Sequence, residues 1–187
     1  MKRTLAFIVF ALPALLAMAD GHMTFKGIEI DGTAQEFAKN LTAKGFKTVG
    51  IENGNAMLTG TFTGQDVIVV AYSTPNTKKV YRIGVIYQGG SQWSLIYNQY
   101  SNLKEMLIKK YGEPTDFVEE VTESYLKGSE LHALHMDKLN YQCDFKTEQG
   151  NVILKIAHER TLGDFILVAY TDAVNGQIAE SEMIDEL

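Results

Sequence analysis

The sequence predicts an α+β fold of two tandem repeats, each consisting of one helix followed by an antiparallel meander of about four strands. Three observations support this prediction. Two segments have the 3.6-residue apolar period of a helix, the segments between them alternate apolar and polar residues as strands do, and the same order of elements occurs twice. A helix with one apolar stripe needs a partner layer, so we expect the helices to pack on the sheet.

The first expected helix begins after Thr33 and ends at Gly45. Thr33 and Glu36 have the spacing of a capping box, in which each side chain accepts a hydrogen bond from the backbone of the other residue. Phe37 and Leu41 lie one turn apart on the same face. Gly45 can adopt the left-handed conformation that ends a helix, and Phe46 can then fold back onto Leu41.

The second expected helix covers residues 94–111. Its apolar residues recur at steps of four, three, four and four, which predicts one buried stripe: Ile96, Tyr100, Leu103, Leu107 and Tyr111. Gly112 and Pro114 end it.

The expected strands follow each helix. Residues 56–63 and 139–146 alternate, which predicts one buried and one exposed face, whereas residues 67–72 and 165–170 are apolar on both faces, as central strands are. Residues 115–125 form a further expected strand. The helix end lies farther from the last strand in the second half, so we expect an insertion near 125–137, and the chain ends in a short acidic helix.

The first 19 residues have the parts of a secretory signal peptide. A cationic start precedes an apolar stretch over residues 5–16, and Ala17, Met18 and Ala19 form a small-x-small cleavage pattern. The stretch is shorter than the roughly 20 residues that cross a bilayer. We expect removal of residues 1–19, a first repeat over 20–90 and a second over 91–187. No cysteine lies near the cleavage point, so the mature protein is expected to be periplasmic or secreted, without a lipid anchor or a membrane span.

Composition limits the possible partners. The chain has 187 residues and a formal net charge of −6, which argues against nucleic acid, since phosphate neutralisation needs clustered positive charge. Cys143 is the only cysteine, so no internal disulfide can form. It alternates with Tyr141 and Phe145, which predicts a buried, protonated thiol rather than a nucleophile.

Three short motifs resemble a group of uncharacterised exported proteins of gut Bacteroidetes. They are residues 23–33 (MTFKGIEIDGT), 44–46 (KGF) and 109–114 (KKYGEP). This resemblance implies a bacterial envelope or secreted location and brings no assigned activity. The layout of helix and meander in tandem is also similar to the β-lactamase-inhibitor-protein architecture, a likeness of fold alone.

The candidate site residues are few. His132, His135 and His158 are the only histidines near carboxylates in the second half, but on a strand His132 and His135 would point to opposite faces. A zinc site needs three or four converging ligands, so we expect no metal and no cofactor. Glu119, Glu120 and Glu123 are expected on a solvated strand face.

Trp93 and Tyr97, which follow the flexible Gly89-Gly90 pair, are the candidate binding residues. Tryptophan and tyrosine are enriched where a surface must be both apolar and hydrogen-bonding. Because no catalytic motif is present, the leading hypothesis is a non-enzymatic module that binds a protein, glycan or small molecule. The alternative is a hydrolase or metal-dependent enzyme of unfamiliar type that uses His132, His135 or His158.

Overall fold

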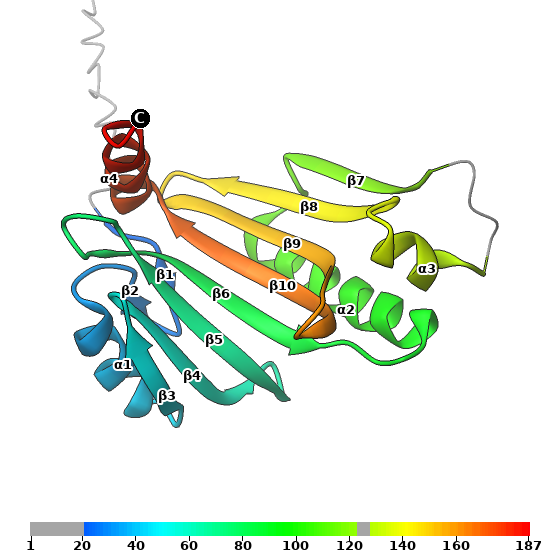
Figure 1. Ribbon diagram of the computed structural model, residues 1–187, viewed down its shortest axis with the longest axis horizontal. Helices are drawn as coiled ribbons and strands as arrows, with labels where there is room; N and C mark the ends of the chain where they lie inside the picture. Colours follow the sequence, from blue (N-terminus) through cyan, green and yellow to red (C-terminus); the bar gives the residue numbers. More distant parts are fainter. Residues whose placement is uncertain (1–20, 123–127) are drawn as a thin grey trace, which may run out of the picture.

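The computed structural model describes residues 21–122 and 128–187 (Figure 1). The expected signal peptide, including Ala17, Met18 and Ala19, lies outside the described residues. Eight antiparallel strands form one sheet in the order β3-β4-β5-β6-β10-β9-β8-β7, and a separate small pair, β1 (Thr24–Phe25) and β2 (Ile28–Glu29), precedes it. The strands of the large sheet are β3 (Lys47–Glu52), β4 (Asn55–Phe62), β5 (Gln65–Ser73), β6 (Val80–Gln88), β7 (Asp116–Val121), β8 (Leu139–Thr147), β9 (Gly150–Glu159) and β10 (Gly163–Asp172).

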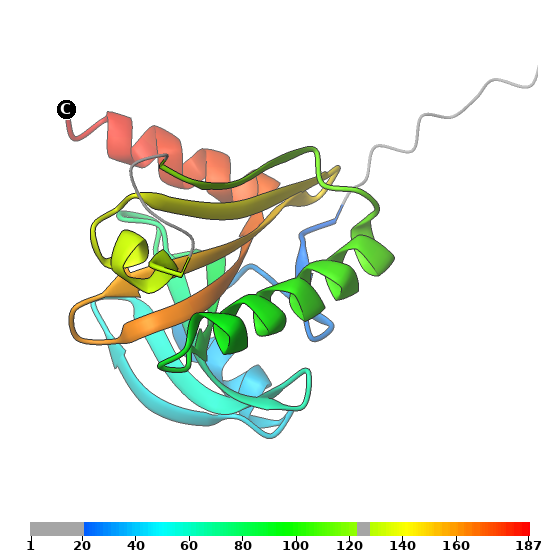
Figure 2. The same cartoon turned by 90° about the vertical axis from the view of Figure 1, so that its right-hand side faces the viewer.

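Two helices cover one face of this sheet. Helix α1 (Ala34–Thr42) packs on β3, β4 and β5, and α2 (Trp93–Tyr111) packs on β8, β9 and β10. Figure 2 shows both on the same side of the curved sheet. Their buried side chains share one core with a row of cross-strand partners that runs through Val69, Val85 and Val168. The α+β class with helices on an antiparallel sheet is therefore confirmed.

The two expected helices end where their capping residues predict. The capping box of Thr33 and Glu36 is present, and Phe46 donates its backbone N–H to the carbonyl of Leu41 at 3.2 Å. Gly45 has a φ of 94°. In α2 the buried residues are Ile96, Tyr100, Leu103 and Leu107, while Tyr111 is half-buried against the same core. Local sequence thus suffices for both helices.

Each of the two helices that cover the sheet is followed by four strands, with α3 between β7 and β8, while β1, β2 and α4 lie outside this order. Helix α1 precedes β3 to β6 and α2 precedes β7 to β10, and the final strands, β6 and β10, are neighbours at the centre of the sheet. The central position of β10 agrees with its apolar character on both faces. Residues on the face opposite α1 and α2 remain partly exposed, among them Met57 and Tyr72.

The segment of the expected insertion contains a helix. On a strand His132 and His135 would point to opposite faces, but both lie in α3 (Glu130–His135), between β7 and β8. The physical reason is the pair Ala133 and Leu134, which are consecutive and both buried. A strand would point them to opposite faces, whereas a helical turn can bury both. The expected strand over 115–125 is shorter, ending at Val121, and residues 123–127 lie outside the described part.

The C-terminal helix α4 (Ala173–Ile184) is longer than the short acidic helix end that the sequence indicated. It lies across the end of the sheet where β10 finishes and β6 begins (Figure 1). Glu182 accepts hydrogen bonds from the backbone of Asn76 and Thr77 in the β5–β6 loop. No helix among the described residues is long and apolar enough to cross a membrane.

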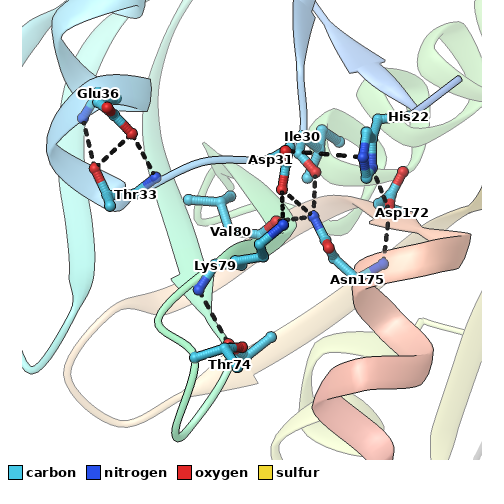
Figure 3. Close-up of polar contacts among 11 residues, drawn as sticks. His22, Ile30, Asp31, Thr33, Glu36, Thr74, Lys79, Val80, Asp172 and Asn175 are labelled. Atoms are coloured by element: carbon cyan, nitrogen blue, oxygen red, sulfur yellow. Dashed lines mark hydrogen bonds and ion pairs between the residues drawn. The ribbon is translucent and has the colours of Figure 1, made fainter.

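A polar cluster joins the N-terminal segment to α4 (Figure 3). The buried Asp172 accepts the backbone N–H of Met23 at 2.7 Å and of Asn175 at 2.8 Å, and its carboxylate contacts the ring of His22. Burial opposes ionisation of Asp31, but hydrogen bonds from Asn175 and Gly32 outweigh it and lower the pKa of Asp31. The hydrogen bonds of this cluster hold distant segments together, which indicates a structural role.

Candidate functional site

Two groups of side chains stand out at one end of the helix-covered face. The first is an aromatic corner, defined as Trp93, Tyr97 and Tyr141. The second is a histidine cluster, defined as His135, His158 and Asp164. Figures 1 and 2 show α3, which carries His135, at the same end of the sheet as the first turn of α2, which carries Trp93.

The aromatic corner is built by the start of α2 and by β8. The ring centroid of Tyr141 lies 5.3 Å from that of Trp93 and 6.0 Å from that of Tyr97, in edge-to-face geometry. Trp93 and Tyr97 are one helical turn apart, with centroids separated by 6.0 Å. Such contacts hold aromatic rings in fixed orientations. The structure therefore brings the candidate residues Trp93 and Tyr97 together on the first turns of α2.

The corner is open to solvent on its outer side. Tyr97 is 40% exposed, and Trp93 and Tyr141 are half-buried. Burial raises the pKa of Tyr141, and the negative charges of Glu119 and Glu130 raise it further. The Tyr141 hydroxyl therefore remains a neutral donor and acceptor at any physiological pH. The result is an apolar surface whose rim carries neutral hydroxyl groups that can donate and accept hydrogen bonds.

Next to the corner a polar network runs from the core to the surface. The Tyr100 hydroxyl lies 3.0 Å from the sulfur of Cys143 and donates to Glu119 at 3.2 Å, while Lys104 pairs with Glu119 at 2.6 Å. Burial raises the pKa of the Cys143 thiol and that of Tyr100. The expected burial of Cys143 is thus confirmed. Glu119 is exposed, as expected for a solvated strand face, and pairs there with Lys104 from α2.

The histidine cluster gathers three elements around one oxygen. His158 at the end of β9 and Asp164 at the start of β10 are cross-strand partners. The Nδ1 atom of His158 lies 2.7 Å from Oδ1 of Asp164, and the Nε2 atom of His135 lies 2.8 Å from the same oxygen. An ionised carboxylate only accepts, so each imidazole donates N–H to it. The ring centroids are 4.1 Å apart.

This cluster corrects part of the sequence interpretation. The sequence argument considered His132 and His135 on a strand, where they point to opposite faces, whereas the structure places both on α3. His135 converges with His158, whereas His132, although exposed, is not one of the three converging residues. Asp164, directly before the strand expected over residues 165–170, was not a candidate site residue. Its pairing with His158 follows from the hairpin register, but the approach of His135 from α3 is purely tertiary.

Comparison with known proteins adds no relative: no family model, no curated protein and no solved structure matches this chain. The resemblance to exported proteins of gut Bacteroidetes, and that to the β-lactamase-inhibitor-protein architecture, therefore stay predictions.

Proposed function

We propose that the protein is a non-enzymatic binding module whose contact surface is the aromatic corner. The observation that carries this proposal is the rigid edge-to-face arrangement of Trp93, Tyr97 and Tyr141 with one ring 40% exposed. Fixed aromatic rings offer large contact area and lose little conformational entropy when a ligand binds. A ligand with an apolar face and a polar rim, such as a glycan, a bile acid or a peptide, fits this surface.

The environment of the single cysteine favours binding over covalent catalysis. A nucleophilic cysteine needs a thiolate and access to solvent. Cys143 is fully buried, its thiol faces the Tyr100 hydroxyl, and its pKa is raised by burial. This residue therefore acts as a packed core group.

The proposal includes location and ancestry. Export through the segment of residues 1–19 would place the mature chain, starting at Asp20, in a bacterial periplasm or outside the cell, and the mass of the exported protein tests this. We also propose that the two halves are tandem repeats. The shared order of a helix and four strands, with the last strand of each half at the sheet centre, supports this ancestry.

Trp93 is the only tryptophan, so it reports directly on the proposed site. Residues 20–187 should be screened against glycans, bile acids and peptides by thermal shift, and hits titrated by tryptophan fluorescence. A ligand at 100 times its dissociation constant adds about 2.7 kcal/mol to the free energy of unfolding, a rise of several degrees in Tm. A hit that leaves Trp93 fluorescence unchanged would place binding elsewhere.

A matched pair of variants locates the site. Tyr97 in the corner is 40% exposed and Tyr72 on the opposite sheet face is 37% exposed. We expect Tyr97→Ala to weaken a hit at least about tenfold, as loss of a central aromatic contact does, and Tyr72→Ala to leave affinity unchanged. Equal effects of the two substitutions would contradict the proposal.

A metal-dependent enzyme remains the second candidate, because the histidine cluster brings His135 and His158 together. It differs from a binding module in an observable way: turnover of a substrate that falls when either histidine is replaced. His132, the third histidine of this hypothesis, lies on α3 outside the cluster.

A further inference from the structure

We infer that His135, His158 and Asp164 form a binding site for a divalent transition-metal ion of the Zn²⁺ type. The inference is independent of the aromatic corner, since it concerns other residues and another kind of ligand. It starts from the convergence of two imidazole nitrogens on one carboxylate oxygen, at 2.8 and 2.7 Å. Three separate elements, α3, β9 and β10, supply these groups.

The spacing suits a single ion. The three ligand atoms lie within 4.8 Å of one another. Atoms bound to one zinc ion at about 2.0–2.2 Å can be at most about 4 Å apart, so only small side-chain rotations are needed. In this structure the two N–H groups point at the Asp164 carboxylate. An ion bound among the three groups would replace these two hydrogen bonds with metal–ligand bonds.

The donor set selects the class of metal. Two imidazole nitrogens and one carboxylate oxygen are ligands that Zn²⁺, Co²⁺ and Ni²⁺ accept. Ca²⁺ and Mg²⁺ prefer six or more oxygens and gain little from imidazole. With three protein ligands, at least one coordination position stays open to solvent or to a bound molecule.

The backbone around the cluster is held in place, as a preorganised site requires. The carbonyl of Asp164 accepts the N–H of Gly89 at 2.8 Å, and a Cβ added at Gly89 would lie 2.5 Å from that carbonyl oxygen. In the β9–β10 turn, the Glu159 carboxylate accepts from the hydroxyl and backbone N–H of Thr161 and from the N–H of Leu162. These bonds fix the hairpin that carries both His158 and Asp164.

The third ligand comes from an anchored helix. Ala133 is fully buried and Leu134 is 4% exposed, so the turn that presents His135 is seated in the core. The ligand side chains themselves reach solvent: His135 and His158 are exposed, and Asp164 is half-buried. An ion can therefore enter without opening the fold.

The test is a titration of untagged residues 20–187 with Zn²⁺ by calorimetry, and with Co²⁺ by visible absorption. We expect one saturable site per chain and the intense visible bands of low-coordinate Co²⁺. His135→Gln and His158→Gln should each weaken Zn²⁺ binding at least tenfold. His132→Gln is the matched control, because it removes an exposed histidine of the same helix that lies outside the cluster, and it should leave affinity unchanged.

Two results would overturn the inference: absence of saturable binding at millimolar Zn²⁺, or equal loss of affinity in all three variants. Tm of each variant is also measured without added metal, and a cooperative transition within about 5 °C of that of the parent separates ligand loss from unfolding. The proposed function can be tested separately from the metal site. A ligand detected by Trp93 fluorescence without added metal would support the aromatic corner even if no Zn²⁺ bound. Conversely, Zn²⁺ binding with no ligand at the aromatic corner would support the metal site alone.

Discussion

At the scale of single residues, close packing decides which small side chains can change. Gly60 in β4 lies under the ring of the buried Phe46, and a Cβ built at Gly60 would be 2.5 Å from a ring carbon. Phe46 is also the residue that folds back after α1. Because Gly60 has no side chain, Phe46 can fold back after α1 and contact the sheet at this position.

We predict that Gly60→Ala lowers the free energy of unfolding by about 1 to 3 kcal/mol, the usual cost of overpacking a core. Gly50 in the neighbouring strand is a matched control, because a Cβ there would meet no atom within 4 Å. Gly50→Ala should change stability by less than about 0.5 kcal/mol. Denaturant unfolding of both variants measures the difference. Similar values for the two would contradict the prediction and show that the Phe46 ring moves aside without loss of stability.

At the scale of elements, α4 stabilises the start of the described chain through one buried amide. The Asn175 side chain is fully buried and donates to the carbonyls of Ile30 and Val80, each at 3.0 Å (Figure 3). It also donates to the Asp31 carboxylate at 2.9 Å. Asn175 thus connects segments far apart in sequence, in addition to the contacts of Asp172 with Met23 and His22.

We predict that Asn175→Ala costs about 2 to 3 kcal/mol, since it leaves buried acceptors without a donor. Asn98→Ala on the exposed side of α2 should keep or slightly raise stability, because alanine favours helices. Chemical denaturation gives both values. Hydrogen exchange in the 21–32 segment should become faster in Asn175→Ala alone, and unchanged exchange there would refute the joining role.

At the scale of the whole molecule, the single core contains several tyrosines that resist ionisation. Burial raises the pKa of Tyr87 to about 12, although the hydrogen bond with Thr63 opposes the shift, and burial also raises the pKa of Tyr100 and Tyr170. In the unfolded chain each would ionise near pH 10. The folded protein therefore keeps protons that the unfolded chain loses.

The sign of the alkaline dependence follows. Stability from these groups is complete below about pH 10 and is lost as pH rises toward the folded pKa values, because the unfolded state then binds fewer protons. We expect Tm to fall above pH 10, less steeply in Tyr87→Phe. Calorimetric scans across this range measure the slopes. Identical slopes in parent and variant would contradict the assignment to Tyr87.

The amino-acid sequence alone determined what depends on near neighbours. The capping box at Thr33, the end of α1 at Gly45, the apolar stripe of α2 and the burial of Cys143 all follow from residues a few positions apart, where periodicity and turn chemistry act. None of these features depends on how the strands of the two halves pair in the sheet.

Only the tertiary structure decided the rest. The pairing of β6 with β10, the use of Tyr141 to complete the aromatic corner and the convergence of His135 on the His158–Asp164 pair join residues distant in sequence. The conformation of residues 130–135 was decided in the same way: the sequence pattern there is compatible with a strand, and burial of both Ala133 and Leu134 against the core favours the helix. Long-range packing overrides local preference when it buries more apolar surface.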